Sequence, residues 1–573
     1  MIRKYKRRFL GIAFVAFGGA VVFMSDASGW LFGGSKQIAG RVVDHRGGAL
    51  EKARIRIVGE KEFVVSDAKG RFTLKLAKER QNSNRRIALA AGKEGFFNGG
   101  KVVRSGRGDV PFQLQPVPRQ DNANYRFLIA SPLHDRFRAN EQVNCANCHT
   151  THLWEWGTSK MGKTVLNQEV AKEYQSFKSA RRANQDDSCA DCHAPLAAVD
   201  NPGKTDLNQS IRQLGNRSKG IECDFCHKIS DVEASNRPGV QSVEFTRRHF
   251  GGGMMQRVMA FGPYDDVTAM PMAASYHPLY KKSEYCSSCH QDGWETPDGR
   301  PWDYLSVYPD AKNRKLYEKG RVIPNQWTYQ EWSEWQATLT DDHQDRGTTC
   351  QNCHMNWSKE MMPYYRYIVS GRIKDQFGNE RNPDSIAPHR FQGATAKMLE
   401  GVARIAVEAT AENERLTVQV GVTNVNAGHR LPTGESSRNL ILLVEAKDGN
   451  GRALRQLSGP AVPHWGGIGN GRFDYARRPG KGFARVTADE RGNKNVPTWK
   501  AVTIVSDNRL KPKVPDRSEY TFSLPGSVDS EEVTVTAKLI YRKKFTTDAR
   551  TDRKSWKETA IEETSIGLDE GGL

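Results

Sequence analysis

The sequence predicts a multidomain protein in which a mainly helical and irregular core is flanked by two all-β sandwich domains. The first observation is that all 10 cysteines of the 573-residue chain fall in one central stretch. The second is that apolar and polar residues alternate with a period of two on both sides of this stretch, as they do in half-buried strands. The third is the chain length, which suggests three or four domains.

Residues 1–29 carry the pattern of an export signal. Basic side chains gather between Arg3 and Arg8, an apolar run follows from Phe9 to Met24, and small polar residues come next. The apolar run is shorter than the roughly 20 residues that a membrane-spanning helix needs. We therefore expect a cleaved signal peptide, with an uncleaved membrane anchor as the alternative. In both cases we expect export to the periplasm, the cell surface or the extracellular space.

Residues 37–117 indicate a small β-sandwich. Ile55 and Ile57 alternate with polar residues, as do Phe72 and Leu74, and turn residues lie at 44–48 and at 67–70. The segments 40–44, 53–57, 66–72 and 93–96 resemble the carboxypeptidase regulatory-like fold. This resemblance implies an accessory or adhesive module without an active site.

Residues 122–398 contain the pattern Cys-x-x-Cys-His five times, and these five motifs use every cysteine. The pattern is typical of c-type haem attachment, in which two thiols bond to the haem vinyl groups and the histidine binds the iron. A zinc site would combine two cysteine pairs and would not need a histidine after each pair. A disulfide framework would not repeat one spacing with no cysteine left over. We therefore predict five haem c groups, attached at Cys145 and Cys148, Cys189 and Cys192, Cys223 and Cys226, Cys286 and Cys289, and Cys350 and Cys353, with His149, His193, His227, His290 and His354 as proximal iron ligands.

The five motifs follow one another too closely for each to have a hydrophobic core of its own. We therefore expect the haems themselves to form the core of this region, wrapped by helices and loops. Helices are expected over residues 164–184 and 326–339. The second helix carries Trp327, Trp332 and Trp335 close to helical spacing, and we expect these rings to pack against haem.

Residues 401–573 indicate a second, larger β-sandwich. Apolar residues alternate with polar ones over 416–422 and over 533–541, and residues 440–444 form a continuous apolar run. This region contains no cysteine, so we expect no covalent haem of its own.

The middle and C-terminal regions resemble a group of exported multihaem cytochromes that includes the tetrahaem cytochromes of nitrifying bacteria and of extracellular filaments. The resemblance implies an electron carrier, but because this chain has five motifs instead of four, a filament role cannot simply be carried over. The resemblance to this group rests on the segments 156–161, 192–195, 221–229, 283–290, 350–355, 388–394, 423–434 and 506–512.

A low-spin haem needs a second axial ligand, and nine histidines lie outside the motifs. The resemblance favours His389 and His277 for this role. His134, which precedes the first motif, and His249, which precedes three glycines, are the further candidates. Met161 offers a thioether as an alternative ligand, and such a ligand would raise the haem potential.

His429 is the fifth candidate and lies in the predicted C-terminal domain, between Gly428 and the segment 431–434. As an iron ligand it would tie that domain to the haem array. The alternative is an ordinary turn histidine that bonds its own loop.

The charge and motif pattern favour an electron relay. The net charge of +19 is partly offset by haem propionates, and the remainder favours an acidic redox partner or an anionic membrane surface. We expect donor and acceptor proteins, or an extracellular acceptor, and no nucleic acid.

One alternative is an oxidoreductase of small nitrogen or sulfur compounds with one open iron site, for which no catalytic residue is assigned. Another is a conductive or adhesive surface assembly, an oligomer or a filament. In pentahaem nitrite reductases, the motif of the active haem has a lysine in place of its histidine. None of the five motifs here has that lysine, and its absence from the motifs favours the relay.

Overall fold

The computed structural model describes the residues 37–81, 86–105, 108–130, 145–147, 149–180, 187–214, 218, 220–233, 239–250, 257–268, 272–296, 299, 301–308, 321–356, 385–467, 473–545 and 558–568. The predicted signal peptide or anchor, the ligand candidate His134 and the attachment residue Cys148 lie outside these ranges. None of the helices within these ranges is long and apolar enough to cross a membrane.

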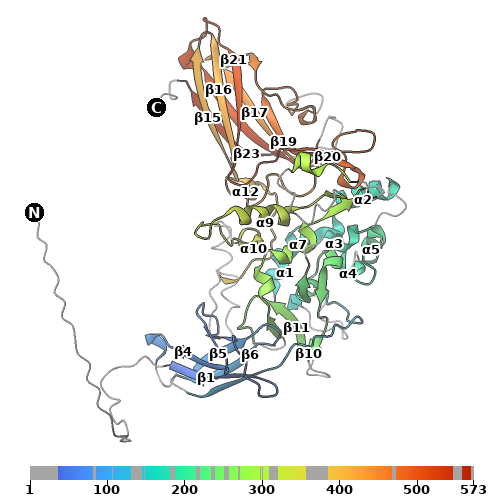
Figure 1. The fold of residues 1–573 in the computed structure, drawn as a ribbon, viewed down its shortest axis with the longest axis vertical. Coiled ribbons are helices and arrows are strands. Elements are labelled where there is room, and N and C mark those ends of the chain that lie inside the picture. The colour runs from blue at the N-terminus through green and yellow to red at the C-terminus, as the bar shows by residue number, and fades with distance from the viewer. Residues whose placement is uncertain are drawn as a thin grey trace, which may run out of the picture.

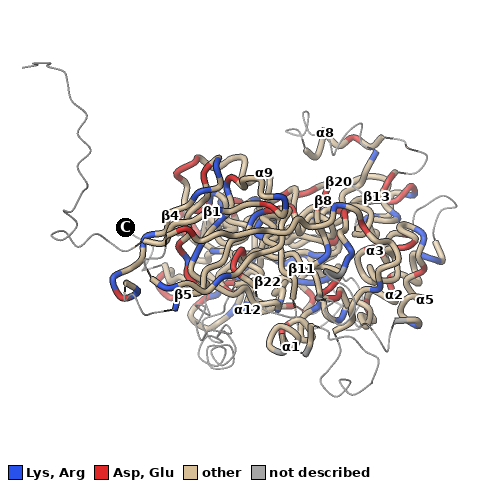
Figure 2. Tube along the Cα trace, turned by 90° about the horizontal axis from the view of Figure 1, so that it is seen from below, with Lys and Arg blue, Asp and Glu red and all other residues tan. Residues whose placement is uncertain are grey.

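Three regions follow one another along the long axis of the molecule (Figure 1). The N-terminal strands lie at one end, the C-terminal sheets lie at the other, and the helices and motifs lie between them. Basic and acidic residues are interspersed along the described trace (Figure 2).

The N-terminal region consists of two small sheets that share one hydrophobic core. In the first sheet β1 lies between β4, to which it is antiparallel, and β7, to which it is parallel. The second sheet has the order β3-β2-β5-β6. The alternating residues predicted to be buried, Ile55, Ile57, Phe72 and Leu74, are all in the core. The strands are β1 (Gln37–Asp44), β2 (Arg54–Ile57), β3 (Val64–Val65), β4 (Arg71–Lys75), β5 (Arg86–Gly92), β6 (Gly99–Arg104) and β7 (Val110–Leu114).

The middle region combines short helices with short strands. The sequence predicted a mainly helical and irregular core, and this prediction missed three small sheets. The helix expected over 164–184 corresponds to α2, which is shorter than expected. The helix expected over 326–339 corresponds to α9. The helices are α1 (Thr150–Thr158), α2 (Gln168–Ala180), α3 (Cys189–His193), α4 (Pro195–Ala198), α5 (Leu207–Leu214), α6 (Cys223–Cys226), α7 (Glu284–His290), α8 (Tyr304–Val307), α9 (Thr328–Thr338), α10 (Cys350–His354) and α12 (Ala396–Leu399). The strands are β8 (Ile229–Val232), β9 (Val243–Phe245), β10 (His249–Phe250), β11 (Arg257–Gly262), β12 (Met272–Tyr276), β13 (Gly293–Glu295) and β14 (Val322–Pro324).

The middle region has apolar packing of its own beside its motifs. Tyr174 and Phe177 of α2 are 1 % exposed and pack with residues of α3, α4 and α5. Phe225, inside the third motif, joins the same cluster. The expectation that haems alone would form the core of this region is therefore too strong, because side chains between the motifs also pack together.

The C-terminal region has two larger sheets, in the orders β15-β16-β21-β18 and β20-β19-β17-β22-β23. Alternate residues of β16 and β22 face a common core, where Val418 and Val535 are fully buried. The strands are β15 (Ala403–Glu412), β16 (Arg415–Asn424), β17 (Asn439–Lys447), β18 (Gln456–Ser458), β19 (Gly480–Ala488), β20 (Thr503–Asp507), β21 (Pro515–Ser523), β22 (Thr534–Arg542) and β23 (Glu558–Gly567).

Candidate haem-binding site

Helical geometry brings the three reactive side chains of four motifs to one face. Residues i, i+3 and i+4 of a helix are neighbours on its surface. The second, third, fourth and fifth motifs lie on α3, α6, α7 and α10, so their two thiols and their imidazole can meet one planar group. In the first motif Cys145 begins a 3₁₀ turn, and His149 N donates to Cys145 O at 2.9 Å.

Thiols of different motifs lie close enough to each other to shift one another's pKa. The contacts bring the first motif to the third, the second to the fourth, and the fourth to the fifth. They join Cys145 to Cys223, Cys192 to Cys289, and Cys286 to Cys350.

The third and fourth motifs are also in contact. The hydroxyl of Tyr285, the residue before Cys286, donates to Cys226 O at 2.9 Å. Tyr280 donates to the same carbonyl oxygen at 2.6 Å and stacks on His227 with the ring centroids 5.5 Å apart. All five motifs therefore form one connected cluster. Its spatial order differs from the order in the sequence, because the third and fourth motifs lie at the centre.

His354 of the fifth motif faces His429 of the C-terminal region. The ring centroids are 6.3 Å apart and the ring planes are 11° from parallel. His354 Nδ1 donates to Gln392 O at 2.6 Å, and His429 Nδ1 donates to Arg430 O at 2.9 Å. A hydrogen bond at Nδ1 fixes the tautomer and leaves Nε2 as the metal-binding nitrogen.

The loop between β16 and β17 holds His429 in this position. Asn424, at the end of β16, is fully buried, donates through Nδ2 to His429 O at 2.8 Å and accepts from Ala427 N at 3.0 Å. A Cβ atom at Gly428 would lie 2.6 Å from a ring carbon of Trp335. Glycine is therefore required for the loop to pack against α9.

His227 of the third motif faces His389 in the same way. The ring centroids are again 6.3 Å apart, and the planes are 26° from parallel. His227 Nδ1 donates to Phe261 O at 2.6 Å, and His389 Nδ1 donates to Ala387 O at 3.0 Å. Two metal–imidazole bonds of about 2 Å put two ring centroids about 6 Å apart. Both pairs therefore fit a metal held between two imidazoles.

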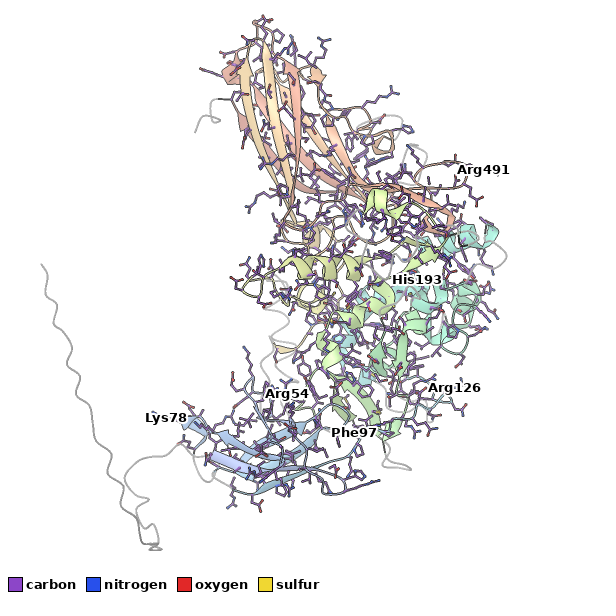
Figure 3. The ribbon with its side chains drawn as sticks, viewed as in Figure 1. Arg54, Lys78, Phe97, Arg126, His193 and Arg491 are labelled. Atoms are coloured by element: carbon purple, nitrogen blue, oxygen red, sulfur yellow. The ribbon has the colours of Figure 1, made fainter. Side chains whose placement is uncertain are left out.

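The electrostatic surroundings favour neutral imidazoles. Burial lowers the pKa of His193 and of His290 to about 4. Burial also lowers the pKa values of His227, His389 and His429. The neutral ring is the form that binds metal. His193 Nδ1 is buried without a hydrogen-bond partner within the described ranges, unlike the Nδ1 atoms of His227 and His354. Figure 3 shows His193 within the middle region.

The remaining predicted ligands are not paired in this way. His277 accepts from Leu279 N through Nδ1, and its Nε2 lies 3.8 Å from a carboxylate oxygen of Glu94. Its ring contacts are with Phe261 and Tyr280. His249 lies on β10, where its backbone pairs with Val258 of β11. Both residues stay predictions as iron ligands.

His152 is a residue that the sequence did not select. It lies on α1, its ring centroid is 4.6 Å from that of His389 and 5.9 Å from that of His149. With His389 and Glu155 it forms a group whose ligand atoms lie within 4.8 Å of one another. The sequence carried one signal for it, a histidine one helical turn after the first motif.

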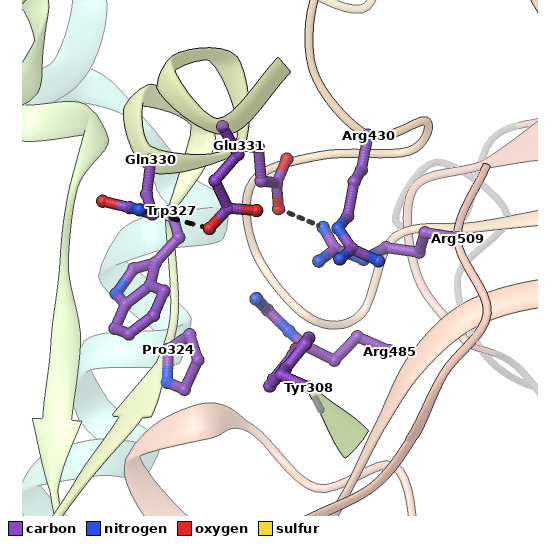
Figure 4. Close-up of a pocket in the computed structure, with 9 residues that line it drawn as sticks. Tyr308, Pro324, Trp327, Gln330, Glu331, Arg430, Arg485 and Arg509 are labelled. Atoms are coloured by element: carbon purple, nitrogen blue, oxygen red, sulfur yellow. Dashed lines mark hydrogen bonds and ion pairs between the residues drawn. The ribbon is translucent and has the colours of Figure 1, made fainter. Parts of the chain in front are cut away.

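A buried charge network joins α9 to the C-terminal region (Figure 4). Glu331 accepts from Arg509 at 2.7 Å and from the Thr433 hydroxyl at 2.6 Å, and Arg509 also binds Asp507 at 2.7 Å. Burial alone would raise the pKa of Asp507, but Arg509 and Arg430 hold that pKa well below its usual value. His429 is therefore not the only connection between these two regions.

Trp327 lies beside this charge network. It is 3 % exposed and packs with Trp302, Tyr308 and Ile504, so it belongs to the contact between the middle and C-terminal regions. A cavity of about 10 Å³ beside it is lined by side chains including Arg485 and has room for about one water molecule.

The family comparison agrees with a site that binds c-type haem. The model of the family described as cytochrome c554 and c-prime matches residues 144–228, which contain the first three motifs. This match supports a multihaem c-type cytochrome. Among solved structures, the crystal structure of a penta-heme cytochrome c552 from Thermochromatium tepidum matches with a TM-score of 0.49 and 19% identity, over 74% of this chain and 97% of that chain. No curated protein matches the chain.

Proposed function

We propose that this chain is an exported electron-transfer protein that carries five haem c groups, one at each Cys-x-x-Cys-His motif. The observation that carries this proposal is the pairing of motif histidines with distant histidines. His227 with His389 and His354 with His429 are separated as two axial ligands of one iron would be. A bound haem iron supplies a one-electron couple whose potential the axial ligands tune.

At the third and fifth motifs, the proposed ligation supports a relay over an enzyme. Iron held by two imidazoles has no open position, whereas catalysis at a metal needs one. The Nδ1 hydrogen bonds to Phe261 O, Gln392 O, Ala387 O and Arg430 O hold the four rings in their orientations. Rings held in this way keep the ligand geometry constant when the iron is oxidised or reduced.

The contacts between motifs support a route for electrons. The thiol of Cys145 contacts that of Cys223, Tyr285 connects the third motif to the fourth, and Cys286 contacts Cys350. We propose the order first, third, fourth and fifth motif, with the second beside the fourth. Electrons would then pass along the molecule from the side of the N-terminal region to the side of the C-terminal region, or in reverse.

The two β regions complete the proposal. We propose that residues 37–117 are a carboxypeptidase regulatory-like sandwich and that residues 401–573 are a second sandwich, both serving as accessory domains. Residues 1–29 would direct export as a signal peptide or as an anchor. Partners would be a redox donor and an acceptor in the periplasm or outside the cell.

Two measurements test this proposal. The intact mass of the mature protein should show five covalent haem additions, and replacing Cys350 and Cys353 by serine should remove one of them. EPR of the oxidised protein should show low-spin ferric haem without a high-spin component. Fewer than five additions would refute the haem count. A high-spin signal in the unmodified protein would refute the pure relay and favour the oxidoreductase.

A further inference from the structure

A methionine lies against the histidine of the first motif. His149 Nε2 and Met272 Sδ are 3.4 Å apart. Nε2 is the nitrogen that a motif histidine turns toward iron, so the thioether lies on the ligand side of this ring. His149 is the one motif histidine whose Nε2 has a sulfur neighbour among the contacts of the described residues.

The strand that carries Met272 is fixed next to the first and third motifs. Met272 begins β12, where it pairs with Val258 of the parallel strand β11. Farther along β11, Phe261 O accepts from His227 Nδ1, and Phe261 N donates to His227 O at 2.9 Å. The sheet that orients the third-motif histidine therefore also positions Met272.

The N-terminal region fixes the same strand from its other side. Asn98 N donates to Ala274 O at 2.9 Å, and Asn98 Oδ1 accepts from Tyr276 N at 3.1 Å. Ser275 Oγ donates to Phe96 O at 2.9 Å. These bonds span from the segment just before β6 to β12, close to Phe97 in Figure 3. The position of Met272 is therefore set by two regions of the chain.

We propose that Met272 Sδ is the second axial ligand, opposite His149, of the haem attached at Cys145 and Cys148. This inference depends on the proposed function, because it requires a haem at the first motif. Bonds of about 2.0 Å to nitrogen and 2.3 Å to sulfur require a nitrogen–sulfur separation of about 4.3 Å. The flexible methionine side chain provides that adjustment of about 1 Å.

His152 is the competing ligand, and its position argues against it. It follows His149 by three residues on the same helical turn, and its ring contacts His389 nearly at a right angle, with 83° between the planes. Its ligand atom belongs to the group with His389 and Glu155. Met272, in contrast, comes from a different element and meets His149 Nε2 directly.

Methionine ligation gives the first haem a distinct role. A thioether in place of an imidazole raises the reduction potential. The first haem would then have a higher potential than the imidazole-paired haems at the third and fifth motifs. Electrons that reach the third motif would therefore be drawn toward the N-terminal end of the cluster.

The test uses the full-length holoprotein and its Met272→Leu variant, with Met161→Leu as the matched control. Near-infrared magnetic circular dichroism of the oxidised protein distinguishes methionine–histidine from bis-histidine low-spin haem. We expect one methionine–histidine haem among five, its loss in Met272→Leu with a new high-spin signal, and no change in Met161→Leu. A Met272→His variant should convert that haem to bis-histidine and lower the highest potential in a redox titration.

The outcomes separate this inference from the proposed function. Five haem additions by mass without a methionine–histidine signal, or loss of that signal in Met161→Leu instead, would overturn the role of Met272 and leave the relay intact. Absence of haem from the first-motif peptide would overturn the proposed haem at that motif. If Met272→Leu does not accumulate as holoprotein, Met272→His, which keeps an axial ligand, decides the question by its spectrum and potential.

Discussion

The imidazole rings of His354 and His429 face each other 6.3 Å apart, with their planes 11° from parallel. One ring belongs to the last motif, on α10, and the other to a loop between β16 and β17 of the C-terminal region. Each ring donates its Nδ1 hydrogen to a backbone carbonyl oxygen, so both offer Nε2 to a metal. This relationship connects the C-terminal region, which has no cysteine, to the proposed haem array.

His429→Ala should convert one haem of five from low spin to high spin. The variant removes one axial imidazole and leaves the attachment cysteines in place, so the haem count by mass should stay at five. EPR of the oxidised protein measures the change. His343→Ala is the matched control, because that ring accepts from Asp345 N within its own turn. An unchanged low-spin spectrum in His429→Ala would mean that His429 is only a turn residue.

Glu331→Gln should weaken the contact between the middle and C-terminal regions. Glu331 and Arg509 are 5 % and 4 % exposed, and removing one partner of a buried ion pair typically costs about 3–5 kcal/mol. Limited proteolysis should release C-terminal fragments faster, while the haem spectrum stays low spin. Glu563→Gln breaks the exposed pair with Lys538 and should cost less than about 1 kcal/mol. Equal protease resistance of the two variants would contradict this.

Asp265→Asn should loosen the N-terminal region. Asp265 is 2 % exposed and lies 2.7 Å from both Arg54 Nε and Arg56 Nε. Arg54 and Arg56 belong to the N-terminal region and Asp265 to the middle region, so these ion pairs lie at the junction of the two regions. Loss of the Asp265 charge leaves both arginines without their carboxylate partner. Figure 3 shows Arg54 at this junction. Cleavage near residue 117, followed by mass spectrometry, should become faster. Asp67→Asn, at the exposed pair with Arg71, is the control. No difference between the two variants would mean that other contacts hold the junction.

Glu222 should make stability decrease as the pH rises. Burial raises the pKa of Glu222 to about 7, although hydrogen bonds from Ala130 N and Ser218 act in the opposite direction. The folded state therefore binds this proton more tightly than the unfolded state, whose pKa is near the ordinary value of about 4.3. This contribution to stability is complete at low pH and is lost between about pH 4 and pH 7.

The urea midpoint at pH 5 and pH 8 measures this effect. Glu222→Gln should reduce the difference between the two midpoints, because the amide does not titrate. In that variant the amide oxygen can still accept from Ser218 Oγ, which donates to the native carboxylate oxygen at 2.7 Å. An unchanged pH dependence in Glu222→Gln would assign the effect to another group.

The sequence by itself determined the features that depend on short spacings. Two cysteines and a histidine at i, i+3 and i+4 share a helix face wherever the helix lies. The alternation over 416–422 and 533–541 predicts strands, and these segments lie in β16 and β22. Such patterns are local, because they follow from the geometry of one element and the need to bury one of its faces.

Only the tertiary structure decided which side chains meet across the molecule. The facing of His227 with His389, the contact of His149 with Met272, and the ion pair of Glu331 with Arg509 each join elements far apart in the chain. The spacing of residues along one element carries no information about which distant element packs against it. These contacts depend on how the sheets and helices pack as a whole. His389 and His429 were candidates from the sequence, but only the structure shows which motif histidine each one meets.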